Sequence, residues 1–223
     1  MQEYKIHYSE KKPALKSCWS SPEWQKAEIA EINNLRPESK EHFPETKLKM
    51  LYNKNGISGI FNVKDKYIIA RGTAHMDPMW NDSCVELFVQ PSIDKGYINF
   101  EFNCLGFLYA SYITNPEKVD GGFKEYVKFK KKECKEVKTA AQLKKKIEKE
   151  IIEPVEWSIQ FYIPFKLIEK FTGHLDLKNN PEWRCNFYKC ADQSSHPHWV
   201  SWSPLKELNF HAPDCFGKLV FTK

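Results

Sequence analysis

The feature that most constrains the fold is a pair of alternating segments within residues 76–106. In residues 84–90 and 97–103 hydrophobic side chains occupy every second position, and residues 91–96 between them contain the Pro, Asp and Gly typical of a turn. Period-two alternation places each set of side chains on one face of a sheet. The pattern therefore predicts an antiparallel hairpin with one apolar face. Its other face carries Glu86, Tyr97, Asn99, Glu101 and Asn103.

Short segments of the same kind continue along the chain, with turn signals between them. This spacing is typical of an all-β sandwich or barrel. A helix-like piece is predicted from Pro22 to Ile32, a second helix at Phe165–Phe171 with Gly173 at its end, and a third within 139–150. The predicted fold is an antiparallel, jelly-roll-like β-sandwich with one or two short helices, formed by a single domain over residues 1–223. The further strands are expected near residues 47–53, 57–63, 67–71, 108–113, 157–163, 183–190 and 217–221.

Composition narrows the function classes. The net charge of +5 is mild for 223 residues and does not indicate a nucleic-acid partner, and no apolar run reaches the roughly 18 residues of a membrane span. The N-terminus is polar and lacks the apolar core of a signal peptide. Seven cysteines, an odd number without a Cys-x-x-Cys pair, favour free thiols in a reducing cytoplasm. An extracellular location is expected instead if a signal preceded this chain.

Residues 123–153 are rich in lysine. Lysines on an exposed edge strand discourage edge-to-edge association, so a solvated edge is the first interpretation. A site for a polyanion is the alternative.

The polar faces of the predicted strands could form one hydrogen-bonding surface beside the loop aromatics Trp80, Trp199, Trp202 and Phe210. Sugars offer hydroxyls at the ring edge and C–H patches on the ring faces, which polar side chains and aromatic rings match respectively. The alternative is that these residues only form cross-strand pairs on an outer face. The polar set is Glu86, Asn99, Glu101, Asn103, Gln160, Tyr162, Arg184, Asn186 and Tyr188.

Several blocks resemble the carbohydrate-binding modules of family 9, in the order in which that family has them. They are W-N-D-S-C-V-E-L-F-V-Q-P at 80–91, Y-I-N-F-E-F-N-C-L-G at 97–106, W-S-I-Q-F-Y-I-P-F at 157–165, W-R-C-N-F-Y-K at 183–189, and S-W-S-P followed by F-H-A-P-D-C-F-G-K-L-V-F within 201–221.

The resemblance implies a β-sandwich that binds sugars, including chain ends of glucans and xylans, without catalysis. A ring would be clamped between two aromatics, with Trp80 as the first and Trp202, Phe210 or Trp199 as the second. Glu86 matches the acidic sugar contact, and Lys189 stands where many relatives carry Arg. The predicted saccharide-binding set is Trp80, Asp82, Glu86, Asn103, Arg184, Asn186, Trp199, Trp202, Phe210 and His211.

The resemblance also implies an oligo- or polysaccharide partner, a bacterial type of protein, and a glycoside hydrolase as associated enzyme, here on another chain. No cofactor is predicted. Structural calcium, held by some members, is left open because no calcium loop is recognisable.

Three alternatives stay open from the residues. Glu86 and Glu101 could act as the acid and base of a glycosidase, although no nucleophile motif accompanies them. Haem could be held by His75, Met76 or Met79. Cys84 and Cys104 are interpreted as small core residues. A zinc site could draw on His196, His198, His211, Cys185, Cys190 and Cys215.

Overall fold

The computed structural model describes residues 1–223, and most of its regular structure is β-strand. Two helices, α1 (Lys131–Cys134) and α2 (Phe165–Thr172), and three short 3-10 turns, η1 (Pro22–Trp24), η2 (Met79–Asn81) and η3 (Pro213–Cys215), complete it. Neither helix has the length and apolar character needed to span a bilayer. The strands are β1 (Glu3–Tyr8), β2 (Ile29–Ile32), β3 (Asn34–Leu35), β4 (Glu45–Asn53), β5 (Gly56–Asp65), β6 (Ile68–Ala70), β7 (Cys84–Gln90), β8 (Tyr97–Asn103), β9 (Leu108–Val119), β10 (Gly122–Lys128), β11 (Lys138–Ala141), β12 (Ile147–Ile151), β13 (Val155–Pro164), β14 (Glu182–Cys190), β15 (Trp199–Ser201) and β16 (Gly217–Thr222).

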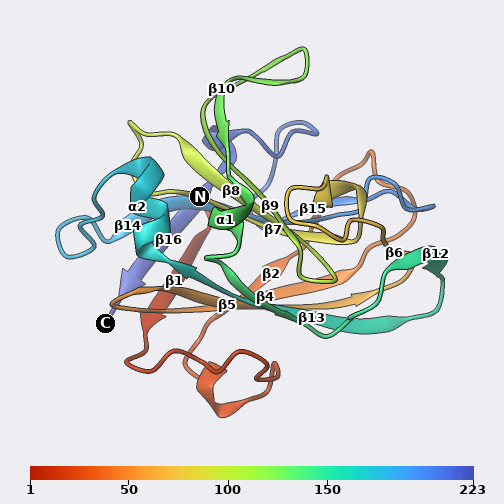
Figure 1. The fold of residues 1–223 in the computed structure, drawn as a ribbon, viewed down its shortest axis with the longest axis horizontal. Helices are drawn as coiled ribbons and strands as arrows, with labels where there is room; N and C mark the ends of the chain where they lie inside the picture. Colours follow the sequence, from red (N-terminus) through yellow and green to blue (C-terminus); the bar gives the residue numbers. More distant parts are fainter.

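One hydrogen-bonded path of strands folds back on itself to make two layers. Its order is β10-β9-β8-β7-β14-β16-β1-β4-β5-β13-β11. Strands β7, β8 and β9 form part of one layer, and β4, β5 and β13 lie across from them in the other (Figure 1). The pairs are antiparallel apart from β1, which runs parallel to both β16 and β4. The predicted all-β sandwich is thus confirmed, with a parallel strand where the chain passes from one layer to the other.

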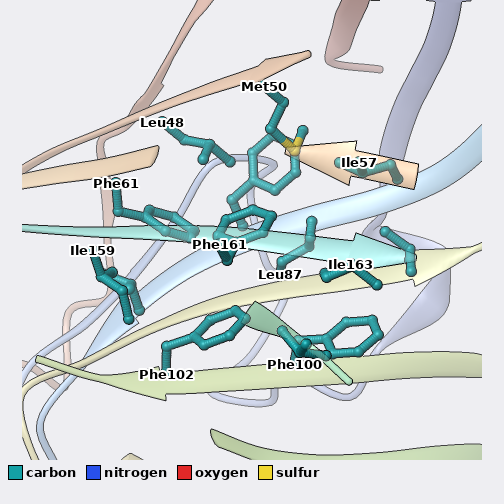
Figure 2. Close-up of a cluster of buried hydrophobic side chains, with 14 of the residues drawn as sticks. Leu48, Met50, Ile57, Phe61, Leu87, Phe100, Phe102, Ile159, Phe161 and Ile163 are labelled. Carbon is teal, nitrogen blue, oxygen red and sulfur yellow. The ribbon is translucent and has the colours of Figure 1, made fainter. Parts of the chain in front are cut away.

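The core lies between the two layers and is built by the alternation that the sequence showed. Leu87, Phe100 and Phe102 point inward from β7 and β8, and Phe161 meets them from β13 (Figure 2). The rings of Phe102 and Phe161 stack with centroids 5.2 Å apart and planes at 10°. Because every second residue of these strands enters this core, the residues between them are fixed on the outer face of the layer.

The hairpin of β7 and β8 and the helix α2 confirm their predictions. Cys84 pairs with Asn103 and Val89 with Ile98, so the register covers the hairpin from end to end. Helix α2 begins directly after Pro164 and ends before Gly173, whose φ of +82° is a left-handed conformation that glycine adopts without strain.

Two predicted helices are wrong. Within 139–150 the chain forms β11 and then β12, because Thr139 and Ala141 pair with Phe161 and Ile159 of β13, and Ile147 pairs with Ala70 of β6. After Pro22 only the turn η1 is helical, and residues 29–32 form β2 against β4. In both places, pairing with a neighbouring strand overrides the local helical pattern.

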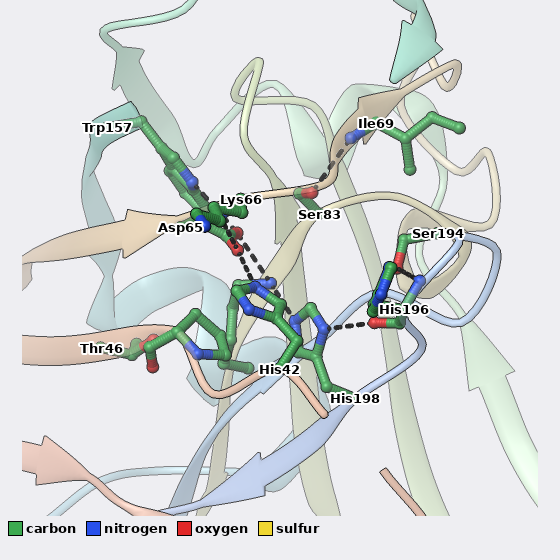
Figure 3. A network of polar contacts seen from close by, with 12 residues as sticks. His42, Thr46, Asp65, Lys66, Ile69, Ser83, Trp157, Ser194, His196 and His198 are labelled. Atoms are coloured by element: carbon green, nitrogen blue, oxygen red, sulfur yellow. Dashed lines mark hydrogen bonds and ion pairs between the residues drawn. The ribbon is translucent and has the colours of Figure 1, made fainter. Parts of the chain in front are cut away.

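A buried polar network joins the two layers. Asp65 at the end of β5 lies with its Oδ2 3.2 Å from Nζ of Lys189 on β14, and both side chains are fully buried. Figure 3 shows His42, His198 and Trp157 gathered around Asp65. Nε2 of His42 lies 2.7 Å from Oδ1 of Asp65, and the Lys189 ammonium lies 2.6 Å from Nε2 of His198. Lys189 therefore faces the interior, and no sugar contact can be assigned to it.

Candidate functional site

A cavity of about 630 Å³ lies on the outer face of the β7–β8–β9–β14 layer. Its volume falls in the range of about 300–1,000 Å³ that small-ligand sites occupy. Glu86, Asn99 and Glu101 line it from β7 and β8, while Trp80 lines it from η2 and Trp199 from the start of β15. The outer face of the hairpin thus forms the floor, as the sequence predicted for these polar residues.

The two floor carboxyls stand directly opposite each other on neighbouring strands. Glu86 of β7 pairs in register with Glu101 of β8, and both are almost fully buried. Asn99 donates a hydrogen bond of 2.6 Å to Oε1 of Glu101, and its own carbonyl accepts from the backbone and hydroxyl of Ser111. Oε2 of Glu101 has no hydrogen-bond partner. The floor therefore offers an unpaired polar atom to whatever occupies the cavity.

Burial also changes the protonation of these carboxyls. Removal from water raises the pKa of Glu86 well above its usual value, with further contributions from Cys190 and Glu101. Burial raises the pKa of Glu101 to about 8, against the opposing hydrogen bond from Asn99. Glu101 therefore keeps its proton at neutral pH, and the floor can donate as well as accept hydrogen bonds.

The turn η2 presents Trp80 to the cavity, and two predicted site residues hold that turn in place. The carboxylate of Asp82 accepts hydrogen bonds from the backbone N–H groups of Arg71 and Gly72, at 2.8 and 2.9 Å. The amide of Asn103 donates to the same carboxylate at 2.9 Å. Both side chains are buried and lie outside the cavity lining. They hold the turn that carries Trp80.

A second loop brings Trp199 to the same cavity. The backbone N–H groups of Asp192 and Gln193 donate to the carbonyls of Trp80 and Asn81, at 3.0 and 3.1 Å, so the two loops are joined. The indole N–H of Trp199 donates to the Asp192 carboxylate at 2.8 Å. Trp80, Asp192 and Trp199 consequently form one connected rim.

The opposite wall comes from the segment before η3. The ring of Phe210 stacks on Tyr188 of β14, with centroids 4.1 Å apart, and its carbonyl accepts a hydrogen bond from the Tyr188 hydroxyl. His211 is hydrogen-bonded to the hydroxyl of Tyr97 at 2.9 Å. Burial lowers the pKa of His211 to about 3, so its ring is neutral. Phe210 and His211 both line the cavity, as predicted.

Other predicted residues lie elsewhere. Trp202 packs inward against Phe187, with ring centroids 4.8 Å apart, and Asn186 is bonded to the backbone of Ser203. Arg184 lies near the start of β14, away from the end that carries Cys190. None of the three predicted residues lines the cavity.

Gln160 and Tyr162, which the sequence placed on the same polar surface, belong to β13 in the other layer. The amide of Gln160 is bonded to the backbone of Ala14 and Lys16. The single polar surface expected from the sequence is therefore divided between the two layers, and only the part on β7 and β8, with Cys190 of β14, reaches the cavity.

Sequence reasoning missed the part of the wall that comes from the hairpin β9–β10. Phe123 and Tyr126 of β10 line the cavity, together with Lys118 and Lys128. Tyr109 of β9 also lines it and meets Trp80 edge-on, with centroids 5.1 Å apart. The sequence did contain a signal for this wall, because Phe123 and Tyr126 are aromatic residues within the lysine-rich stretch. Strand β10 lies at the end of the sheet path, so the predicted edge strand is confirmed.

The residues proposed for haem or for zinc do not converge. His75 accepts a hydrogen bond from the backbone of Leu108, and Met76 contacts Cys134. Met79 is buried in a small cluster apart from the main core, against which Met76 packs. His198 belongs to the Asp65 network and His211 to the cavity wall. Cys84 and Cys104 are buried, as predicted.

Solved structures share the fold. One from Bacteroides uniformis, a protein whose carbohydrate-binding role is itself inferred, matches with a TM-score of 0.81, 25% identity and 99% coverage of both chains. A family 9 carbohydrate-binding module from Caldicellulosiruptor kristjanssonii, in complex with cellotriose, matches with a TM-score of 0.61 and 13% identity, covering 99% of this chain and 93% of that one. The module from that organism in complex with glucose gives 0.59 and 12%, covering 98% and 95%.

Two sequence comparisons agree with the fold. A protein of Arthroderma benhamiae named "Extracellular protein" is 23% identical over 188 residues, which cover 80% of this chain and 79% of that protein. The family model described as carbohydrate-binding family 9 matches residues 22–221 and so takes in both the floor and the loops of the cavity. The chain therefore belongs to carbohydrate-binding family 9.

Proposed function

We propose that the cavity binds a pyranose ring of an oligo- or polysaccharide without chemically changing it. One observation carries the proposal: the half-buried indoles of Trp80 and Trp199 line the same cavity as its polar floor. That floor consists of the carboxyls of Glu86 and Glu101 and the amide of Asn99. Aromatic rings cover the C–H faces of a sugar, and the floor pairs with hydroxyls at the ring edge.

The protonation of the floor suits a neutral sugar. A sugar hydroxyl both donates and accepts, and a floor whose Glu101 carboxyl keeps its proton at neutral pH can do the same. Because Oε1 of Glu101 accepts from Asn99, the proton of the neutral carboxyl belongs on the unpartnered Oε2, which would donate to such a hydroxyl. A bound sugar would satisfy this buried oxygen, which otherwise costs on the order of 1–3 kcal/mol.

Family membership and the related structures support the same ligand class. The two structures from Caldicellulosiruptor kristjanssonii are complexes with cellotriose and with glucose, so β-linked gluco-oligosaccharides are the first ligands to test here. Xylo-oligosaccharides should be tested next. Their pyranose rings lack the exocyclic hydroxymethyl group, so a difference in affinity shows whether the cavity wall contacts that group.

Calorimetric titration of the full chain with cello- and xylo-oligosaccharides tests the proposal. We expect saturable binding that Trp80→Ala weakens by at least about tenfold, equivalent to about 1.4 kcal/mol. Trp19→Ala is the matched control, since Trp19 is also half-exposed but stacks with Lys49, outside the cavity. Equal affinity of Trp80→Ala and wild type would contradict the proposal.

Binding without catalysis is tested with the same sugars. We expect no release of reducing ends during prolonged incubation, and we expect Glu86→Gln to weaken binding less than Trp80→Ala does. Turnover by wild type that Glu86→Gln or Glu101→Gln abolishes would instead establish a glycosidase. A partner glycoside hydrolase on a separate chain remains a prediction, and co-purification with polysaccharide-degrading enzymes would test it.

A further inference from the structure

Two thiols and a carboxyl converge at the base of the cavity. Cys84 and Cys190 stand directly opposite each other on β7 and β14, and Glu86 follows two residues after Cys84 on the same outer face. Sγ of Cys190 lies 3.2 Å from Oε1 of Glu86, and Sγ of Cys84 lies 4.0 Å from the same oxygen. The potential ligand atoms of all three residues lie within 4.8 Å of one another.

These separations suit a tetrahedral metal ion. Zinc–sulfur bonds of about 2.3 Å and zinc–oxygen bonds of about 2.0–2.2 Å place neighbouring ligand atoms roughly 3.3–3.8 Å apart. The separations of the two sulfurs from Oε1 of Glu86, 3.2 and 4.0 Å, lie on either side of that range. Small side-chain rotations would therefore bring both sulfurs and this oxygen to one ion. Both sulfurs and the carboxyl are also held on strands, which fixes their relative positions.

A second, independent observation points to an occupant. Oε2 of Glu101 is buried and has no hydrogen-bond partner, and Glu101 stands directly opposite Glu86. Cys190, Glu86 and Glu101 all line the cavity, so an ion has a route from solvent and a fourth coordination position can face the cavity.

The other cluster of potential ligands does not present the same case. His42, Asp65 and His198 also lie close together, but the Lys189 ammonium already stands within 3.2 Å of Asp65 and 2.6 Å of His198. That cluster is occupied by a cation of the chain itself, whereas Glu86 forms no ion pair and Lys189 approaches only the backbone carbonyl of Cys190 there.

We propose that Cys84, Cys190 and Glu86 form a binding site for a thiophilic divalent cation such as Zn²⁺ or Cd²⁺. The ion enters through the cavity and forms bonds to both sulfurs and to a Glu86 oxygen. Each thiol loses its proton to solvent, and so does Glu86 where it is protonated. No electron transfer is involved.

Proton release sets the pH dependence of this site. Burial raises the pKa of Cys84 to about 12 and that of Cys190 well above its usual value, so both are thiols in the metal-free protein. Because the ion must displace those protons, the apparent affinity rises with pH.

Metal and saccharide would share Glu86, which couples the two ligands. This coupling rests on the proposed saccharide site, whereas metal binding by the two thiols does not. Occupation of Glu86 by an ion is expected to weaken sugar binding, and the sugar must then weaken metal binding by the same factor.

Titration of the full chain with Cd²⁺, in a non-thiol reductant, tests the proposal through the thiolate-to-cadmium absorption band. We expect saturation at one equivalent, release of protons into weakly buffered solution, and loss of the band in Cys84→Ser and in Cys190→Ser. Glu86→Gln keeps both thiols and should weaken binding by more than about 10–100-fold, the loss that even an outer-shell partner can cause. Cys18→Ser and Cys104→Ser, an exposed and a buried control outside the cluster, should titrate as wild type does.

Absence of the band in wild type would overturn the proposal, as would a band that survives Cys190→Ser or disappears in Cys18→Ser. Circular dichroism shows whether each variant is folded, and the wild-type and Glu86→Gln titrations decide the matter even if a cysteine variant is not. A wild type that binds sugar but no Cd²⁺ refutes the metal site alone, and the reverse result refutes only the saccharide site.

Discussion

Replacing Lys189 by methionine tests how the two layers are joined. Lys189 and Asp65 are both fully buried, with Nζ and Oδ2 3.2 Å apart. Methionine keeps most of the side-chain volume but removes the charge, which leaves the Asp65 carboxylate buried with His42 as its nearest ionisable partner. Breaking a buried pair in this way costs about 3–5 kcal/mol. At roughly 2–4 °C per kcal/mol for a chain of this size, the melting temperature should fall by about 6–20 °C.

The pH dependence of that loss has a definite sign. The Lys189 ammonium and the His42 hydrogen bond, acting against burial, hold the pKa of Asp65 well below its usual value. A carboxyl with a lowered pKa stabilises the fold above its unfolded-state pKa, near 4, and this contribution is lost as the pH falls through the folded-state pKa. The difference between wild type and Lys189→Met should therefore be full at neutral pH and shrink below about pH 4.

Denaturant unfolding of the two single variants and the double variant measures this coupling. We expect Lys189→Met combined with Asp65→Asn to cost less than the sum of the single changes, because the double variant leaves no unpaired buried charge. Lys206→Met is the control, since Lys206 and Asp214 form an exposed pair expected to contribute at most about 1 kcal/mol. A loss within about 0.5 kcal/mol for Lys189→Met, or strict additivity, would refute the reasoning.

Three further predictions concern single side chains. The folded-state pKa of Glu101 is raised to about 8, so the fold loses stability as the pH rises from the unfolded-state pKa, about 4.3, to that value. Glu101→Gln should therefore be more stable than wild type in alkaline but not in acidic unfolding experiments. Hydrogen bonds from the Ser20 and Ser21 hydroxyls lower the pKa of the exposed Cys18 to about 7. An alkylating agent should therefore modify Cys18 before the other cysteines, as mass spectrometry would show. The alkylation rate should rise around neutral pH, whereas that of an ordinary thiol rises at higher pH. Trp202→Ala should cost about 3–5 kcal/mol in denaturant unfolding because its ring is buried against Phe187, whereas Trp199→Ala should lower sugar affinity with a smaller loss of stability.

The sequence allowed the central hairpin and the face of each of its residues to be predicted. Alternation in residues 84–90 and 97–103 correctly placed Leu87 and Phe100 in the core and Glu86 and Glu101 on the outer face. Alternation cannot tell which sheet a strand joins, however. Gln160 and Tyr162 alternate as clearly as Asn99 and Glu101 do, yet β13 lies in the opposite layer.

Contacts between distant segments explain most of what the sequence did not reveal. Thr139 and Ala141 carry a local pattern compatible with a helix, and only the pairing of β11 with β13 makes this segment a strand. Asp82, beside Trp80 in the sequence, and Asn103, on the polar face of its strand, were predicted to touch a sugar. In the structure they use their hydrogen-bonding groups to hold the Trp80 turn, a distinction that depends on the backbone of residues 71 and 72.

The saccharide site is tested most directly by the indole N–H signals of the seven tryptophans. In a proton–nitrogen NMR spectrum, addition of a cello-oligosaccharide should shift the signals of Trp80 and Trp199, which line the cavity, and leave those of Trp24 and Trp157, which are buried elsewhere and bonded to Ser17 and Asp65. Single Trp→Phe variants assign the signals. Saturable shifts of Trp80 and Trp199 are the predicted result. Shifts confined to the other tryptophans, with Trp80 and Trp199 unchanged at saturating sugar, would contradict the assignment of this cavity.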